Sequence, residues 1–138
     1  MKNLRQIVGA TLWWAEGTKS RHDKRWKNTV TYPLEITSTD PRVIQLFLNF
    51  IRHDIKIDES RLRVQLHLHA NDNIKELESY WLHVCKISKN QLHKTIIRPA
   101  GRKIGKTRGT CKIRYHDKKA YLSAKKILDR IIQQTEAL

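Results

Sequence analysis

The chain has little cysteine, and its two cysteines are badly spaced for the common uses of that residue. Cys85 and Cys111 form no Cys-x-x-Cys pair, so the sequence offers neither a zinc-binding pattern nor the framework of a disulfide-rich protein. Both have apolar neighbours in the sequence. We therefore expect two buried free thiols.

Long hydrophobic runs are also missing. Residues 7–15 are uncharged and follow two basic residues, as in a signal peptide, but the run is short, contains two tryptophans and ends in Glu16 without an A-x-A-like cleavage site. No segment approaches the length of a membrane span. These absences predict a cytoplasmic, intracellular protein that is not secreted and has no membrane partner.

Acidic residues are scarce, because 13 Asp and Glu stand against 28 Lys and Arg, which gives a formal net charge of +15. The excess is uneven: residues 89–126 hold thirteen basic residues and one acid, whereas residues 33–88 are nearly neutral. A generically basic surface would usually intersperse both signs. The clustering is typical of a protein that binds a polyanion.

The length of 138 residues, with 39% apolar residues, suits one compact domain over residues 1–138. Apolar periodicity and turn signals predict four helices and four strands, at about residues 3–16, 40–54, 72–87 and 117–135 for the helices and 30–36, 61–69, 92–98 and 110–115 for the strands. Asp40-Pro41 marks one helix start, and Asn71 or Asp72 marks the next. Residues 18–28 suit a short strand and a hairpin turn. The prediction is an α+β fold with antiparallel strands and helices on one face.

Alternation along the predicted strands places polar and basic side chains on the face that the helices leave open. These are Arg61, Arg63, Gln65, His67 and His69 from one strand, Lys112 and Arg114 from another, and Lys94 and Arg98 from a third. A curved sheet of this kind can lie in the DNA major groove, where Arg reads guanine and Gln reads adenine. An ordinary solvated face is the alternative, although it would tolerate Glu, Ser and Thr at these positions.

The pair His67 and His69 could also form half of a metal site. No third ligand has a recognisable spacing, so polar positions on the sheet face are the favoured interpretation. In the strand predicted over residues 30–36, Glu35 falls on the polar side with Thr31 and Thr37 beside it.

The first predicted helix ends in an unusual way. Residues 7–15 carry no charge, Glu16 is the first acid, and Gly17 follows it at once. A carboxylate at the C-terminal end of a helix opposes the helix dipole, so a plain structural role explains Glu16 poorly. Small residues along the helix would let it pack closely against a second copy, so that the two carboxylates meet.

The segment Gly9-Ala-Thr-Leu-Trp-Trp-Ala-Glu16-Gly17 resembles the LAGLIDADG motif of homing endonucleases, with Glu16 at the family's penultimate acid. The resemblance implies that family's αββαββα core, an antiparallel saddle-shaped sheet with helices on one face. Two tryptophans replace the smaller pair typical of the middle of the motif. The helix predicted over residues 72–87 stands where the family usually has a simple hairpin.

With one motif in the chain, the resemblance implies a homodimer, with contacts through Ile7, Val8, Thr11, Leu12 and Ala15. It implies that the Glu16 carboxylate and the Ala15 carbonyl hold Mg²⁺ or Mn²⁺ beside the scissile phosphate. Glu16, Lys112 and Arg114 are then the catalytic candidates, the last two by stabilising charge on the phosphate. Basic residues flanking the face residues complete the predicted DNA contacts: Lys19, Arg21, Lys24, Arg25, Lys27, Arg102, Lys103, Lys106 and Arg108.

The expected function is sequence-specific binding of double-stranded DNA with metal-dependent phosphodiester hydrolysis, that of a nucleoid-associated, homing-type endonuclease. Two alternatives stay open. A non-cleaving DNA-binding transcriptional regulator is favoured by the tryptophan pair and by the lack of a second catalytic residue that a motif identifies, whereas Glu16 favours the enzyme. An RNA-binding, maturase-like protein suits the basic face equally well.

Overall fold

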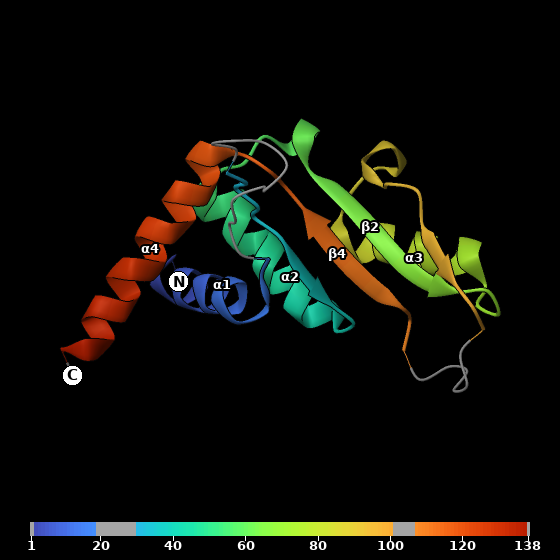
Figure 1. Ribbon diagram of the computed structural model, residues 1–138, viewed down its shortest axis with the longest axis horizontal. Helices are drawn as coiled ribbons and strands as arrows, with labels where there is room; N and C mark the ends of the chain where they lie inside the picture. Colours follow the sequence, from blue (N-terminus) through green and yellow to red (C-terminus); the bar gives the residue numbers. More distant parts are fainter. Residues whose placement is uncertain (1, 19–29, 101–106, 138) are drawn as a thin grey trace.

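The computed structural model of the chain describes residues 2–18, 30–100 and 107–137. Within these ranges the chain forms four α-helices and four β-strands (Figure 1). In chain order they are α1 (Lys2–Glu16), β1 (Ile36–Ser38), α2 (Pro41–Phe50), β2 (Arg63–His69), α3 (Ile74–Cys85), β3 (Ile96–Arg98), β4 (Thr110–Arg114) and α4 (Lys118–Glu136). The predicted α+β class is confirmed.

The four strands form one mixed sheet in the order β1-β4-β2-β3. β4 runs antiparallel to both of its neighbours, with Ile113 opposite Ile36 of β1 and Val64 of β2. β3 runs parallel to β2, with Ile97 opposite Leu68. The prediction of a wholly antiparallel sheet is therefore wrong at this edge. The cause is α3, which follows β2 and carries the chain back along the sheet, so that β3 enters in the same direction as β2.

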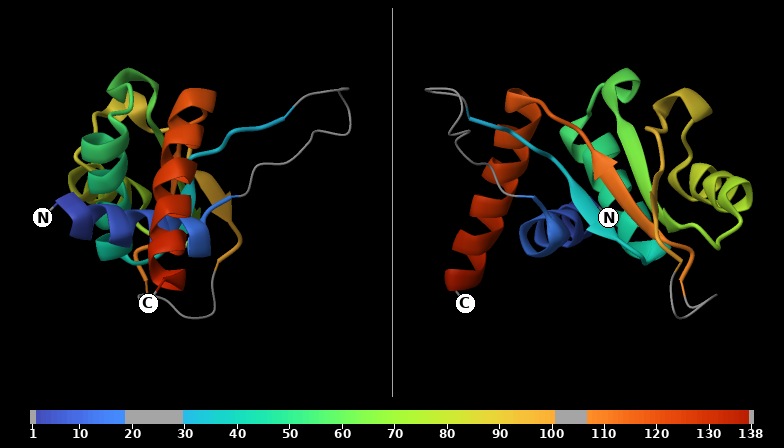
Figure 2. Two further views of the ribbon diagram at one scale, coloured as in Figure 1. Left: turned by 90° about the vertical axis from the view of Figure 1, so that its left-hand side faces the viewer. Right: turned by 45° about the vertical axis from the view of Figure 1, so that its right-hand side comes forward.

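Helices α1, α2 and α3 lie on the same side of the sheet, as predicted, and Figure 1 shows them behind and beside the strands. α4 stands next to α1, at the end of the sheet where β1 forms the edge (Figure 2). No described helix covers the other face of β2 and β4. None of the described helices has the length and apolar content that crossing a lipid bilayer requires.

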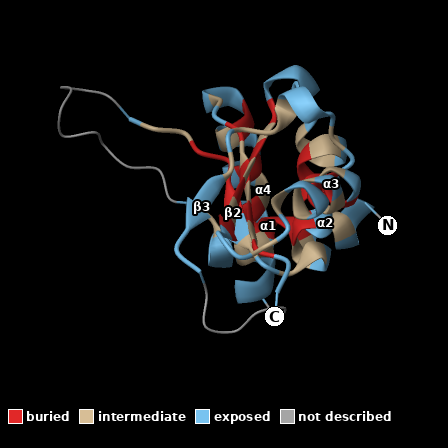
Figure 3. Ribbon diagram, turned by 90° about the vertical axis from the view of Figure 1, so that its right-hand side faces the viewer, coloured by how far each residue is buried: buried red, intermediate tan, exposed pale blue. Residues whose placement is uncertain are grey.

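The core lies between the sheet and the helices, where Figure 3 shows the buried residues. The alternation predicted for strand 61–69 is confirmed in β2, since Val64, Leu66 and Leu68 are fully buried and the residues between them are not. The helices supply the other side of the core, with Phe47 of α2 and Trp81 of α3 fully buried.

The two cysteines meet in this core. Cys85 ends α3 and Cys111 lies in β4, and both are buried as free thiols, as predicted. Their Sγ atoms are 3.9 Å apart. The hydrogen bond with Cys85, together with burial, raises the pKa of the Cys111 thiol. The reactive thiolate is thereby disfavoured.

α1 packs on α2 at very short range. Its buried residues are Gln6, Gly9, Ala10 and Trp13. A Cβ at Gly9 would lie 2.2 Å from the Cβ of Phe50 in α2, so any larger residue there would push the helices apart. This requirement for glycine sets which face of α1 turns inward.

The strand predicted over residues 30–36 is found only at its last residue, Ile36. The three residues before it are buried together with it instead of alternating. The segment has neighbours on both sides, because the Leu34 N–H donates to the Tyr115 carbonyl at 2.7 Å while Ile36 pairs with Gly17 at the end of α1. Successive residues are buried for different reasons: Leu34 and Ile36 lie in the core, while Lys112, Arg114 and His116 cover Glu35 on the other face.

The predicted start of the second helix is confirmed, since Asp40 caps α2 and Pro41 is its first residue. α3 is capped by Asn73, one residue beyond the two predicted positions. Asp72 instead accepts a hydrogen bond of 2.8 Å from the His69 N–H and closes the turn after β2. The Asp72 side chain is thus used by the strand end rather than by the helix.

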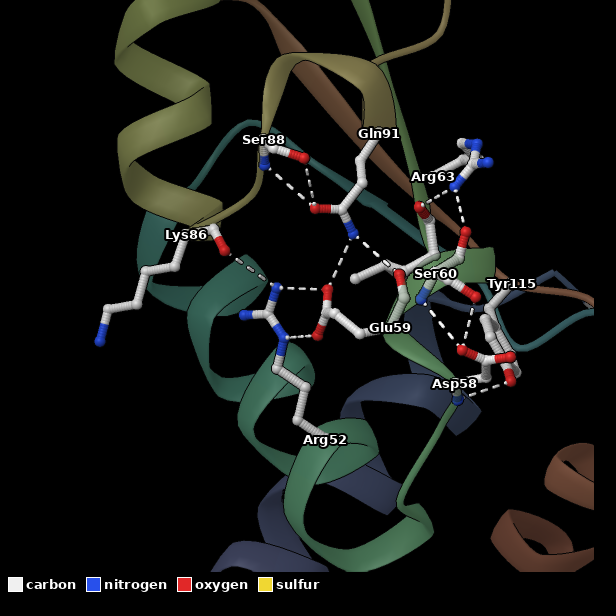
Figure 4. Close-up of polar contacts among 10 residues, drawn as sticks. Arg52, Asp58, Glu59, Ser60, Arg63, Lys86, Ser88, Gln91 and Tyr115 are labelled. Atoms are coloured by element: carbon white, nitrogen blue, oxygen red, sulfur yellow. Dashed lines mark hydrogen bonds and ion pairs between the residues drawn. The ribbon is translucent and has the colours of Figure 1, made fainter.

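A polar network fixes the segment that leads from α2 into β2 (Figure 4). Arg52 Nε donates to Glu59 Oε1 at 2.8 Å, and Gln91 Nε2 donates to Glu59 Oε2 at 2.9 Å. The Asp58 N–H donates to the Tyr115 hydroxyl at 2.9 Å. These contacts come from four separate segments, and together they anchor the start of β2.

Candidate nucleic-acid interface

The face of the sheet turned away from the helices carries most of the side chains that alternation predicts for it. Six of them come from β2 and β4, and we refer to them as the open face: Arg63, Gln65, His67, His69, Lys112 and Arg114. Strand pairing sets Arg63 opposite Arg114 and Gln65 opposite Lys112. Because directly opposed side chains start about 5 Å apart, three basic groups share one patch.

Hydrogen bonds connect the open face across its strands. Arg114 Nη1 donates to Gln65 Oε1 at 3.1 Å, and Gln65 Nε2 donates to the Lys94 carbonyl at 3.3 Å. On the other side, Arg98 ends β3 with its Nη2 3.3 Å from His67 Nδ1. Arg98 and the backbone carbonyl of Lys94 therefore lie at the margin of the open face. The prediction that Lys94 belongs to the third strand is wrong, because β3 begins only at Ile96.

Two histidines experience the positive charge of this region. Burial and the neighbouring charges of Arg98 and Lys112 lower the pKa of His67 below its ordinary value of 6.5. Burial and two arginines of the open face likewise lower the pKa of His93, which the sequence did not single out. A lowered pKa disfavours the charged imidazolium form of both side chains, so the fixed positive charge of the open face comes from its lysine and arginines.

Glu16 is the last residue of α1 and is exposed where the helix meets the sheet. The Gly17 N–H donates to the Trp13 carbonyl at 2.8 Å, and the Thr18 N–H donates to the Glu35 carbonyl at 3.3 Å. A Cβ at Gly17 would lie 2.2 Å from the Trp13 carbonyl oxygen and 3.0 Å from that of Glu35. Only glycine fits there, which explains why the acid is followed at once by Gly17.

Lys112 and Arg114 are ion-paired with Glu35. Lys112 Nζ lies 3.7 Å from Oε1 of Glu35, and Arg114 Nε lies 3.5 Å from Oε2. His116 Nε2 is 2.6 Å from the same Oε2, and the Glu35 side chain is only 3% exposed. We refer to these four residues as the Glu35 cluster. Sequence reasoning missed it, and the only signal was an acid on the polar side of a predicted strand.

Two residues predicted to contact DNA lie elsewhere. Arg61 belongs to a 3₁₀ turn, Glu59–Arg61, before β2, and its Nη1 is 3.1 Å from Asp117 Oδ1 at the start of α4. The guanidinium of Arg108 lies over the ring of Tyr80 in α3, 4.7 Å from the ring centre. The Asp117 carboxylate binds Arg61, and the Tyr80 ring binds Arg108 through a cation–π contact. Arg108 is therefore held on the helical side of the sheet.

The remaining predicted DNA contacts lie outside the described residues: Lys19, Arg21, Lys24, Arg25, Lys27, Arg102, Lys103 and Lys106. The strand and turn predicted over residues 18–28 also fall outside them, apart from Thr18.

One apolar face of α1 is exposed. Its residues follow helical spacing, and we refer to them as the α1 outer face: Leu4, Ile7, Thr11, Trp14 and Ala15. The side chains of Leu4, Ile7 and Trp14 are 58%, 47% and 54% exposed. Three of the five predicted dimer contacts belong to this face, while Val8 and Leu12 are half-buried at its borders.

The predicted metal ligands, Ala15 and Glu16, lie at the exposed end of α1. Within residues 2–18, 30–100 and 107–137, no group of three or more His, Cys, Asp or Glu side chains is placed to hold a metal ion. The oxygen donors of Ala15 and Glu16 are of the hard type that Mg²⁺ and Mn²⁺ prefer. One chain supplies a single carboxylate, so the predicted site requires the second from another copy.

The fold and its open face define an α+β protein with a cationic, uncovered sheet surface. No protein-family model, no curated protein and no solved structure matches the chain. The resemblance to the LAGLIDADG motif therefore depends on residues 9–17 themselves and on where they lie in the fold.

Proposed function

We propose that this protein is a homodimeric, homing-type endonuclease that binds double-stranded DNA with its open face and hydrolyses phosphodiester bonds with Mg²⁺ or Mn²⁺. The observation that carries the proposal is the position of Glu16. Its carboxylate is exposed at the end of α1, directly after the α1 outer face. Two residues further on, the Thr18 N–H donates to the Glu35 carbonyl, and the Glu35 side chain contacts Lys112 of the open face.

The shape and chemistry of the open face support recognition of a DNA groove. Adjacent strands lie about 4.8 Å apart, and the major groove is about 12 Å wide. A pair of strands such as β2 and β4 therefore fits within it. Arg63 is suited to guanine, and Lys94 and Arg98 at the margin are suited to phosphates.

The α1 outer face supports association of two chains. A two-fold contact through this face would bring the two α1 helices together, and the two Glu16 residues with them, because Ala15 lies in the face itself. Two neighbouring carboxylates repel each other, and a hard divalent cation removes that conflict. When bound, the metal ion would polarise the scissile phosphate and activate a water molecule.

The experiment that tests the proposal is cleavage of a library of duplexes with a randomised centre, in the presence of Mg²⁺ or Mn²⁺. The wild-type chain should produce a defined set of cut sequences. Glu16→Gln should abolish cleavage while leaving duplex affinity intact or slightly higher, because one negative charge near phosphate is lost.

Glu136→Gln is the matched control, since Glu136 is also an exposed glutamate at the end of a helix, α4. It should cut like the wild type. Absence of cleavage by the wild-type chain on every sequence would refute the nuclease function. Unchanged cleavage by Glu16→Gln would refute the role of Glu16.

A non-cleaving DNA-binding regulator is the second candidate, and one observation favours it. Lys112 and Arg114, the predicted partners of Glu16 at the phosphate, already share the charge of Glu35. Tight duplex binding without any cleavage would support the regulator. An RNA partner is less suited to the open face, because the deep, narrow major groove of A-form RNA does not admit side chains, and competition between duplex DNA and duplex RNA measures the difference.

A further inference from the structure

Glu35 has more positive partners than its own charge requires. Three basic side chains lie within 3.7 Å of its carboxylate oxygens, and the carboxylate itself is almost entirely buried. Lys112 and Arg114 alone exceed the charge of Glu35 by one. A buried ion pair contributes little net stability compared with an apolar pair of the same size, so stability alone does not account for this arrangement.

The three partners come from alternate positions of one segment. Lys112 and Arg114 are in β4, and His116 follows two residues later. Their side chains are 27%, 34% and 50% exposed, so each remains accessible to solvent while it contacts the carboxylate beneath. The surplus positive charge is therefore available to an external anion on the open face.

Arg114 is held from two directions. Its Nε lies 3.5 Å from Glu35, and its Nη1 donates to Gln65 at 3.1 Å. Gln65 is in turn fixed by the Lys94 carbonyl at 3.3 Å. A free lysine or arginine side chain has about 2 kcal/mol of rotamer entropy to lose when it binds a ligand. Because these contacts already restrict Arg114 in the unbound protein, less entropy is lost when the ligand binds.

We propose that Glu35 is a positioning residue that holds Lys112 and Arg114 ready to receive a phosphate group of duplex DNA on the open face. This inference rests on the proposed function, because the anion is taken to be a DNA phosphate. It assigns to Glu35 an effect on affinity that acts through the two basic side chains and not through contact with DNA.

Charge and positioning predict opposite results for Glu35→Gln. The substitution removes one negative charge from a cationic face, so electrostatics alone would tighten duplex binding. If Glu35 positions the two cations, their release should instead weaken binding. We expect the dissociation constant for a short duplex, measured by fluorescence anisotropy at fixed salt, to rise at least tenfold.

Asp54→Asn is the matched control. Asp54 is also a buried acid, with a fully buried side chain bound by Arg5 Nε at 2.7 Å, but it lies between α1 and the end of α2, away from the open face. This variant should bind duplex like the wild type. Thermal unfolding of both variants shows whether each remains folded.

Glu35→Asp provides a second variant if Glu35→Gln does not fold. It keeps the charge but draws the carboxylate back from its partners, so electrostatics predicts no change and positioning predicts weaker binding. In a Lys112→Met background the effect of Glu35→Gln should shrink, because one of the two positioned groups is gone.

The outcomes separate this inference from the proposed function. If the wild type binds duplex and Glu35→Gln binds equally or more tightly, the positioning role is wrong and the proposed function stands. Equal weakening by Glu35→Gln and Asp54→Asn also overturns it, because a general loss of stability then explains both. If the wild-type chain binds no duplex, the proposed function fails and the inference fails with it.

Discussion

Replacement of Ile7 by aspartate should convert the proposed dimer into a monomer. Ile7 lies in the middle of the α1 outer face and is 47% exposed in the single chain. In a two-fold interface through this face, every substitution occurs twice. Ile7→Asp therefore removes two apolar contacts and introduces two carboxylates at the same place.

The expected magnitude follows from the exposure. Complete burial of an isoleucine side chain contributes about 1.5–3 kcal/mol, so covering the exposed half of Ile7 contributes about 1 kcal/mol per chain and about 2 kcal/mol per dimer. Two unpaired carboxylates add at least about 2 kcal/mol of desolvation. The total of about 4 kcal/mol corresponds to an increase of about 1000-fold in the dimer dissociation constant. The stability of the single chain should change by less than about 1 kcal/mol, since the site is exposed.

Sedimentation velocity over a series of protein concentrations measures this change. Ile97→Asp is the control, because Ile97 is 48% exposed but lies on β3, at the opposite edge of the sheet from β1. It should leave the dimer intact. A dimer that persists in Ile7→Asp, or a wild-type chain that is monomeric at every concentration, would show that the α1 outer face is not the interface.

Three further results are expected. Duplex affinity should fall steeply with salt, because about eight phosphate contacts in a dimer, from Lys94, Arg98, Lys112 and Arg114 of each chain, give a slope of about −7 in a plot of log K against log salt; a flat response would rule out nucleic-acid binding. Gly9→Ala should lower the free energy of unfolding by about 1–3 kcal/mol, measured with urea, because the new Cβ meets Phe50 at 2.2 Å; a gain, as helix propensity alone would give, would contradict the close packing. Because the folded-state pKa values of His67 and His93 lie below 6.5, the unfolded chain takes up protons first, and stability should decrease as the pH falls below about 7 and level off below the folded-state pKa values. His67→Gln should reduce this decrease in urea titrations between pH 8 and 5, and an unchanged decrease would contradict the assignment.

Much of the secondary structure could be predicted because its signals are local. The Asp-Pro start of α2 requires only neighbouring residues, and so does the alternation that places Val64, Leu66 and Leu68 in the core. The orientation of β2 and β4 then determines the open face. Most of the residues proposed to contact DNA could therefore be identified before the structure was known.

The missing features depend on contacts between distant residues. Glu35 is buried by Lys112, Arg114 and His116, which are about eighty positions further along the chain. The inward face of α1 is set by the fit of Gly9 against Phe50, and the sequence of α1 alone is apolar on both sides. No pattern within a short stretch of sequence shows which residues bury Glu35 or which face of α1 turns inward.

The parallel strand is the largest difference from the predicted sheet, and it lies away from Glu16, although Arg98 of β3 borders the open face. β3 is at one edge of the sheet and β1 at the other. The contacts that place Glu16, from Gly17 to Ile36 and from Thr18 to Glu35, involve only the end of α1 and the segment entering β1. The crossover through α3 can therefore alter how the far margin of the open face meets DNA without altering the helix that ends in Glu16. Duplex affinity of an Ile96→Asp variant tests this separation, because Ile96 lies opposite His67 of the open face. Recognition at the β3 edge should weaken while association through α1 stays the same.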